Sequence, residues 1–190
     1  MIIIVGLPGA GKTSVLNELK KMKNLEIVNF GDLISEIAIK KGLIKNRDEL
    51  NYVPVKIHKE LQKTIVKKIK QLDKKARKDK KILIIDTHAL LKKKEGFFPG
   101  ISPEFLKEKI EGFIFIDAPS EEIIERRKTD KTRTREIVSK DEIDKHRFLS
   151  ICFLSSYSSQ TGAPLFIVEN RNNRLEEAVK QISEIINYTR

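Results

Sequence analysis

The feature that most constrains the fold of this chain is a glycine-rich stretch at residues 6–13, which reads Gly-Leu-Pro-Gly-Ala-Gly-Lys-Thr. Its glycines, lysine and threonine have the spacing of a phosphate-binding loop. The apolar run Ile2–Val5 before it predicts a buried strand, and apolar residues at helical spacing over 14–22 predict a helix after it. Because the motif requires a strand, a loop and a helix in this order, the sequence predicts a nucleotide site at the start of an α/β fold.

Each residue type in this loop has a chemical reason. Glycines let the backbone N–H groups point at phosphate oxygens without a Cβ in the way, and the following helix adds the positive end of its dipole. The Lys12 ammonium can reach the β- and γ-phosphates, and the Thr13 hydroxyl can bind Mg²⁺. We therefore expect ATP and Mg²⁺ as cofactors. The residues expected to bind the nucleotide are Gly6, Leu7, Pro8, Gly9, Ala10, Gly11, Lys12, Thr13 and Ser14.

The rest of the chain alternates between strand and helix signals. Strands are predicted at 2–5, 25–29, 81–86, 113–117 and 165–168, with helical stripes between them. Because these strands are almost continuously apolar, they indicate a parallel sheet covered on both faces. With 190 residues and no linker, we expect a single domain over 1–190 with a P-loop NTPase fold: α/β, five parallel strands, helices on both faces. Residues 95–103, which hold two glycines and two prolines, are expected to form a loop, with Ser102 capping a short helix.

Composition narrows the class of protein. The chain is 39% apolar and 34% charged with a formal net charge of +11, which is typical of a globular protein with a heavily charged surface. A single cysteine, Cys152, excludes an internal disulfide or a cysteine-rich zinc site. No apolar run approaches the roughly 20 residues of a membrane helix, and no signal peptide precedes the glycine-rich loop. We therefore expect a cytoplasmic protein. A guanine-reading Asn-Lys-x-Asp motif is also absent, which argues against a GTPase.

Phosphoryl transfer needs further charged groups around the acceptor, and three segments supply candidates. Arg47 opens a predicted short helix and can clamp an acceptor phosphate in its planar fork; the alternative is a surface arginine paired with Asp48 or Glu49. Asp86, Thr87 and His88 follow the third predicted strand, where parallel sheets place their ligands. Asp86 is the candidate metal-side carboxylate, and Thr87 and His88 are candidate acceptor contacts. Alternatively, Asp86 caps the next segment and His88 fills a polar gap.

The third candidate segment contains six cations within residues 126–135: Arg126, Arg127, Lys128, Lys131, Arg133 and Arg135. The stretch 128–140 has almost no apolar residues and is expected to be an exposed, mobile loop that closes over polyphosphate as a lid. Arg133 and Arg135 lie two residues apart, so both would face inward from an extended lid. The alternative is a basic loop that faces RNA or solvent.

Taken in order, several motifs of this chain resemble the archaeal-type adenylate kinases over nearly its whole length. They are the loop at 6–13, Val28-Asn29-Phe30-Gly31-Asp32, Arg47-Asp48-Glu49, Asp86-Thr87-His88, Gly96-Phe97-Phe98-Pro99-Gly100, Thr132-Arg133-Thr134-Arg135 and Thr161-Gly162-Ala163. The resemblance implies the reaction Mg-ATP + AMP ⇌ 2 ADP, a nucleoside-monophosphate segment at about 30–60, a short lid without zinc at about 128–140, and often a homotrimer. Together with the placement of Asp86, Thr87 and His88 at a strand end, it gives Lys12, Arg47, Arg133 and Arg135 as candidate catalytic residues, and Phe30, Gly31, Arg47, Thr87 and His88 as candidate substrate contacts.

Two positions depart from the family pattern. Asn51 and Ile151 stand where the family commonly has a cation that would contact phosphate, and Arg147 lies one helical turn before Ile151, where it could partly substitute. Two alternative functions therefore stay open. One is a kinase for another nucleoside monophosphate, which an acceptor panel would reveal. The other is a nucleotide-switched RNA or ribosome assembly ATPase, which salt-dependent RNA binding would reveal.

Overall fold

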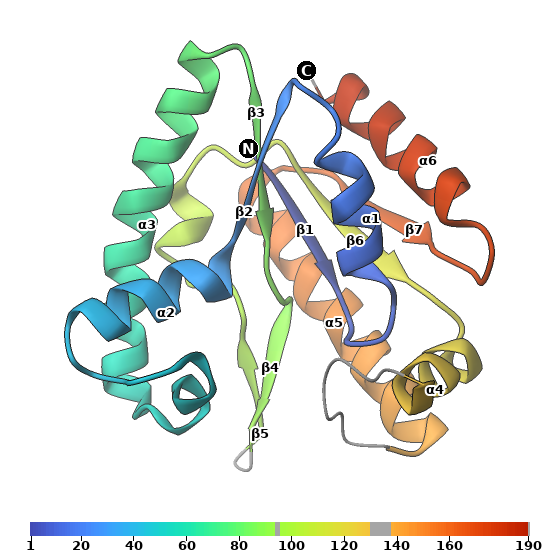
Figure 1. The fold of residues 1–190 in the computed structure, drawn as a ribbon, viewed down its shortest axis with the longest axis horizontal. Coiled ribbons are helices and arrows are strands. Elements are labelled where there is room, and N and C mark those ends of the chain that lie inside the picture. The colour runs from blue at the N-terminus through green and yellow to red at the C-terminus, as the bar shows by residue number, and fades with distance from the viewer. Residues whose placement is uncertain (94–95, 130–137, 190) are drawn as a thin grey trace.

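The computed structural model describes residues 1–93, 96–129 and 138–189, and its centre is a sheet of five parallel strands (Figure 1). The strand order is β2-β3-β1-β6-β7. The strands are β1 (Ile2–Gly6), β2 (Leu25–Asn29), β3 (Ile82–Asp86), β6 (Gly112–Asp117) and β7 (Leu165–Glu169). All five predicted strands and their parallel arrangement are thus confirmed.

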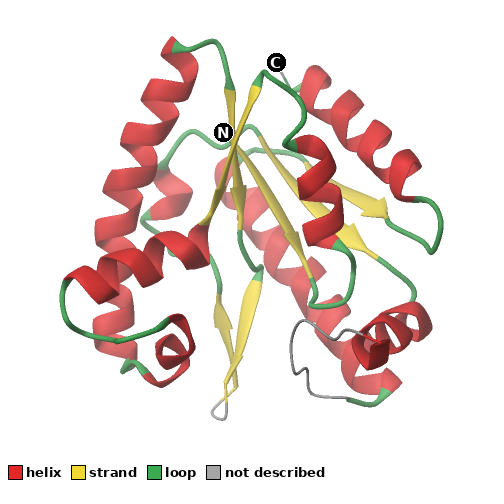
Figure 2. Ribbon diagram, viewed as in Figure 1, coloured by secondary structure: helices red, strands yellow, loops and turns green. Residues whose placement is uncertain are grey.

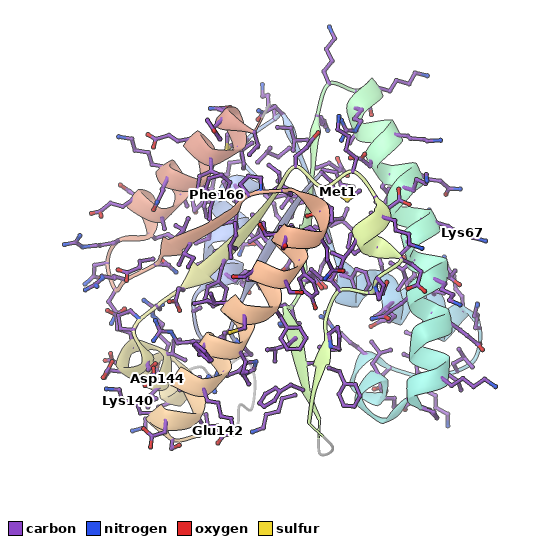
Figure 3. The ribbon with its side chains drawn as sticks, turned by 180° about the vertical axis from the view of Figure 1, so that it is seen from behind. Met1, Lys67, Lys140, Glu142, Asp144 and Phe166 are labelled. Carbon is purple, nitrogen blue, oxygen red and sulfur yellow. The ribbon has the colours of Figure 1, made fainter. Side chains whose placement is uncertain are left out.

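Helices cover both faces of this sheet (Figure 2). They are α1 (Lys12–Leu19), α2 (Phe30–Lys40), α3 (Val55–Lys78), α4 (Ser120–Thr129), α5 (Lys140–Thr161) and α6 (Leu175–Tyr188). Helices α1 and α6 lie together on one face, and α5 lies on the other (Figures 1 and 3). Two 3₁₀ helices, Arg47–Tyr52 and Phe105–Lys107, complete the helical elements. In the part of the chain described here, no helix is long and apolar enough to span a membrane.

The core explains why the central strands are so uniformly apolar. Every residue of β1 and β6 is buried, because helices on one face and helices on the other exclude water from both sides. The edge strand β7 is less covered, and its Ile167 keeps 46% of its surface exposed. The central strand β1, buried along its whole length, therefore leads directly into the glycine-rich loop.

Helix ends follow the expected capping chemistry. Ser139 begins α5 by accepting a hydrogen bond from the Glu142 N–H at 3.2 Å, as its capping box predicts. Asn29 begins α2 in the same way, accepting from the Asp32 N–H at 2.9 Å. The predicted loop over 128–140 is wrong at its ends, because α4 extends through Thr129 and α5 starts at Lys140. Its remaining part, 130–137, lies outside the described residues.

The predicted loop at 95–103 is also wrong in part. Residues 96–99 form strand β5 (Gly96–Pro99), which pairs antiparallel with β4 (Leu90–Lys93) as a two-stranded hairpin. Gly100 is needed here for close approach, because a Cβ on it would lie 2.0 Å from the His88 carbonyl oxygen. Only glycine therefore allows the chain that leaves β5 to pack against residues 88 and 89, which directly follow β3. The predicted cap is present, since Ser102 Oγ accepts from the Phe105 N–H at 3.3 Å.

Candidate active site

The carboxyl ends of the parallel strands meet at one edge of the sheet, and the candidate residues gather there. Strand β1 leads into the glycine-rich loop, β2 ends at Asn29, and β3 ends at Asp86. The register sets Asp86 beside Ile4 on one side and beside Asn29 on the other. This edge is where α/β sheets bind their ligands.

The glycine-rich loop has a conformation that only glycine adopts easily at two points. Gly9 and Gly11 have φ angles of 97° and 83°. At Gly11 a Cβ would also lie 2.2 Å from Asn170 Nδ2. The loop ends as α1 begins at Lys12, so Thr13 and Ser14 stand exposed in the first turn of that helix. Free N–H groups at a helix start suit a phosphate, as the sequence predicted.

Asn170 forms a buried hydrogen bond with the glycine-rich loop. It directly follows β7, is only 5% exposed, and donates from Nδ2 to the Ala10 carbonyl at 2.9 Å. Its own N–H donates to the Asp117 carbonyl at 2.8 Å, which fixes it against the end of β6. Sequence reasoning did not select Asn170, although a polar residue that follows an apolar strand at the carboxyl edge was an available signal.

Lys12 points from α1 toward the end of β3. Its ammonium donates to the Thr87 carbonyl at 2.8 Å and forms an ion pair with Asp86. The Thr87 side chain is buried, so the contacts of this residue run through its main chain, including an N–H bond to Ile4 O at 3.1 Å. The structure therefore brings together the predicted lysine and the predicted carboxylate.

The oxygen atoms near Lys12 fit a magnesium ion. Asp86 is buried, and its Oδ1 faces Lys12 without forming a hydrogen bond to any residue that the structure describes. Across the described ranges there is no cluster of three or more His, Cys, Asp or Glu residues that could enclose a metal. Mg²⁺ usually binds one or two protein oxygens together with substrate phosphates and water, so Asp86 and the Thr13 hydroxyl suffice.

Arg47 lies on the acceptor side of Asp86. It starts the 3₁₀ helix Arg47–Tyr52 and forms an ion pair with Asp32 of α2, with half of its side chain exposed. The guanidinium covers Gly31, where a Cβ would lie 2.8 Å from Arg47 Nη2. Glu49 is engaged elsewhere, since it accepts from the Lys45 N–H at 2.8 Å. Arg47 thus keeps the open face that a phosphate clamp requires.

Phe30 differs from the other predicted substrate contacts. Its ring is only 7% exposed and stacks on Phe105 with the ring centroids 6.0 Å apart. The aromatic side chain therefore belongs to the core, and a substrate contact at this position falls to the main chain.

His88 directly follows Thr87 and lies near the charges of Lys12, Asp86 and Arg47. Its side chain is exposed to solvent, while neighbouring protein atoms still crowd the ring. This crowding, followed by the positive charge of Lys12, lowers the pKa of His88 to about 4. The imidazole is therefore neutral at pH 7 and offers one donor and one acceptor.

The base of the predicted lid is anchored to the nucleotide loop. Arg127 Nε donates to the Pro8 carbonyl at 2.8 Å, and Arg126 Nη2 donates to the Asn170 carbonyl at 2.9 Å. A cavity of about 270 Å³ opens between the loop, the hairpin and α5. Its lining residues are Pro8, Lys92, Arg127, Val138, Glu142, Ile143 and His146. Lys131, Arg133 and Arg135 lie outside the described residues, so their predicted roles stay predictions.

Arg147 is held by protein groups rather than left free for phosphate. It forms two hydrogen bonds with the buried Asp117 carboxylate, at 2.8 and 2.6 Å, and a third at 3.1 Å with Asp144. The hydrogen bond to Asp117 raises the pKa of Arg147 still further above its ordinary value. This favours a structural role over the phosphate contact expected from the sequence. Ile151 packs against the core one turn later.

Comparisons with known proteins agree with this geometry. A family model described as "AAA domain" matches residues 5–144. The adenylate kinase of Methanothermobacter thermautotrophicus is 38% identical over 189 residues, which cover 98% of both chains. The adenylate kinases of Methanocaldococcus jannaschii and Pyrococcus furiosus are each 35% identical, covering 98% of this chain and 97% and 94% of their own. Among solved structures, a shikimate kinase from Bacteroides thetaiotaomicron aligns over 98% of this chain and 97% of its own, with a TM-score of 0.48 and 12% identity.

Proposed function

The chain belongs to the adenylate kinase family of phosphotransferases, and we propose that its active site transfers a phosphoryl group reversibly from Mg-ATP to AMP, giving two ADP. One observation supports the site assignment above all. Lys12 and Asp86 on the donor side, and Arg47 on the acceptor side, lie along one continuous set of polar contacts at the carboxyl edge of the sheet. Direct transfer requires the donor and acceptor phosphates to be held in line and close to each other, and this set of contacts would place the two binding groups side by side.

The donor phosphates bind over the glycine-rich loop. Backbone N–H groups of the loop and of the start of α1 face the phosphate oxygens, and the Lys12 ammonium moves from Asp86 and Thr87 to the β- and γ-phosphates. Thr13 and Asp86 would hold Mg²⁺, and the metal would neutralise charge on the same phosphates.

The acceptor phosphate binds at Arg47. The guanidinium exchanges its exposed ion pair with Asp32 for two parallel hydrogen bonds to the AMP phosphate. An oxygen of that phosphate then attacks the γ-phosphorus, and the bond between this phosphorus and the β–γ bridging oxygen breaks, leaving ADP on each side. No covalent enzyme intermediate is needed. His88, neutral and beside both phosphates, contributes a hydrogen bond to the acceptor.

We further assign residues 30–60 to acceptor binding and 128–140 to a lid whose Arg133 and Arg135 stabilise the transferring phosphoryl group. Water exclusion by the lid protects ATP from hydrolysis. The proposal also includes a homotrimer and a cytoplasmic location, which the family resemblance implies.

An acceptor panel tests the proposed function. Phosphoryl transfer from Mg-ATP is measured with AMP, CMP, UMP, GMP and no acceptor, following each nucleoside diphosphate. Rapid ADP formation with AMP alone supports the proposal and shows that cations at positions 51 and 151 are dispensable. Faster transfer to another monophosphate would show that this nucleotide, and not AMP, is the substrate. Slow ATP loss without transfer would overturn the proposal.

A further inference from the structure

We propose that Asn29 is a positioning residue that couples the donor and acceptor halves of this active site, an inference that rests on the function proposed above. Asn29 is the last residue of β2 and the cap of α2, so its side chain stands at the carboxyl edge of the sheet. There it contacts the donor-side carboxylate with one end of its amide and the acceptor-side arginine with the other.

The donor-side contact comes from the sheet register. Asn29 and Asp86 are partners in the parallel pairing of β2 with β3, which sets the two side chains beside each other. Asn29 Nδ2 donates to Asp86 Oδ2 at 2.5 Å. Asp86 Oδ1 remains on the side of Lys12. The amide therefore fixes which carboxylate oxygen faces Lys12, and this oxygen would be the one available to Mg²⁺.

The acceptor-side contact comes from the other end of the amide. Asn29 Oδ1 accepts from the Asp32 N–H at 2.9 Å and lies 3.5 Å from Arg47 Nη2. Arg47 also forms an ion pair with Asp32. Asn29 thus orients both the arginine and the aspartate that holds it.

Helix capping alone does not require asparagine at this position. Aspartate and serine cap helices about as well, because capping needs only a side-chain oxygen that accepts. Among the side chains that cap helices well, only an amide accepts from N–H donors and also donates an N–H to a carboxylate. An aspartate here would face Asp86 with a second negative charge, and a serine has only one short hydroxyl for both tasks. The identity of residue 29 is therefore explained by Asp86 rather than by α2.

The coupling has a kinetic consequence. In-line transfer depends on the position of the acceptor phosphate at Arg47 relative to the metal-side carboxylate, and a displacement of about 1 Å can lower the rate on the order of 100-fold. The Asn29 side chain contacts both Asp86 and Arg47. Loss of its Nδ2 donor therefore shifts the position of the carboxylate relative to the arginine, while Oδ1 still caps the helix.

The test compares Asn29→Asp and Asn29→Ser with wild type and with Asn24→Asp. Asn24 precedes β2 at the opposite end of the strand, where its carbonyl accepts from the Ile82 N–H at 2.9 Å, so the control makes the same chemical change far from the site. We expect Asn29→Asp to stay folded with a melting temperature lowered by the facing carboxylates, and, per folded molecule, to lose at least tenfold in kcat, to raise KM for AMP and to need more Mg²⁺ for half-maximal rate. Asn29→Ser should show a smaller loss, and Asn24→Asp none.

Kinetics per folded molecule separate positioning from mere structural damage. A raised KM for AMP and a raised Mg²⁺ requirement, both measured on the folded fraction of Asn29→Asp, are changes that loss of stability alone does not produce. Unchanged kcat, KM and Mg²⁺ dependence in Asn29→Asp, or losses matched by Asn24→Asp, would overturn the inference.

Failure of the proposed function is distinguishable from failure of this inference. The acceptor panel on the wild-type protein judges the function first. Should wild type transfer to no acceptor, calorimetric binding of ADP with and without Mg²⁺ still decides the coupling. A reduced effect of Mg²⁺ on ADP affinity in Asn29→Asp, but not in Asn24→Asp, supports it, and an equal effect in all three proteins refutes it.

Discussion

Lys12 of α1 and Asp86 at the end of β3 form an ion pair in which both side chains are 12% exposed. In the proposed reaction the lysine reaches the donor phosphates and the aspartate would bind the metal. On this proposal the pair holds two reaction groups together until nucleotide separates them. Binding then exchanges one charge partner for another, so neither group is left buried and unpaired at any stage.

Replacing Lys12 by alanine should abolish most of the transfer. The substitution removes the cation that spreads charge on the β- and γ-phosphates, and the loss of one such contact typically lowers kcat by about 10²–10³-fold. Single-turnover transfer from ATP measures the effect. Lys20→Ala is the matched control, because Lys20 is an exposed lysine at the end of the same helix. Turnover near the wild-type rate in Lys12→Ala would refute the assigned role.

Substituting Gly11 by alanine should damage the loop more than its backbone angle alone predicts. Gly11 has a φ of 83°, and its added Cβ would also lie 2.2 Å from Asn170 Nδ2. Gly42→Ala is the control, since Gly42 has a φ of 68° with no atom within 4 Å of an added Cβ. We expect Gly42→Ala to cost about 1–2 kcal/mol of unfolding free energy through left-handed strain alone. Gly11→Ala should lower the unfolding free energy by more than this and should also weaken ATP binding. Urea denaturation measures the first effect and calorimetry the second. Equal losses of unfolding free energy in the two variants would argue against a tight contact between residue 11 and Asn170.

Removing Arg147 should lower stability rather than slow the chemistry. The side chain forms two hydrogen bonds with Asp117, whose side chain is 8% exposed, and its loss leaves a buried carboxylate without its cation. Breaking such a pair typically costs about 3–5 kcal/mol.

Other contacts connect the start of α5 to α4. They include the Lys140–Glu121 ion pair at 2.5 Å and the Ser120–Asp144 hydrogen bond at 2.5 Å. Lys140 and Asp144 are labelled in Figure 3.

Urea denaturation of Arg147→Ala measures this cost, with Arg171→Ala as control. Arg171 pairs with Glu169, and both side chains are about half exposed, so its removal should cost under about 1 kcal/mol. The kcat per folded molecule should stay near wild type in Arg147→Ala. A tenfold fall in kcat with little loss of stability would instead assign Arg147 to phosphate binding.

Stability should fall with acidity through the titration of His88. Its pKa is lowered from 6.5 to about 4 in the folded protein, so between these values the unfolded chain binds a proton that the folded chain does not. The free energy of unfolding therefore decreases as pH falls through this window. His146, whose pKa burial also lowers, contributes in the same direction.

Urea denaturation at several pH values checks this slope, and NMR titration assigns it to individual histidines. His88→Gln should reduce the dependence of unfolding free energy on pH between 6.5 and 4, and the part due to His146 and to carboxylates of lowered pKa such as Glu111 and Asp144 should remain. A His88 resonance that titrates near its ordinary pKa would contradict the crowded position described for this side chain.

Several elements could be predicted because their signals are local. The phosphate-binding loop, the five strands and the caps at Ser102 and Ser139 each depend on residues within a few positions of one another. The β4–β5 hairpin was missed because Gly96, Pro99 and Gly100 are also typical of loops. What makes Gly100 part of a hairpin return is its contact with His88, twelve residues earlier, which no local pattern contains.

The candidate site shows the same division. The sequence by itself determined the chemistry: a lysine and a threonine after a glycine-rich loop, an aspartate after a buried strand, and an arginine at a helix start. Only the tertiary structure decided which partners these groups have, since it placed Asn29 between Asp86 and Arg47, Asn170 behind Ala10, and Arg147 against Asp117. The physical reason is that local periodicity fixes the conformation of a segment, whereas strand order and register fix which distant side chains meet at the edge of the sheet.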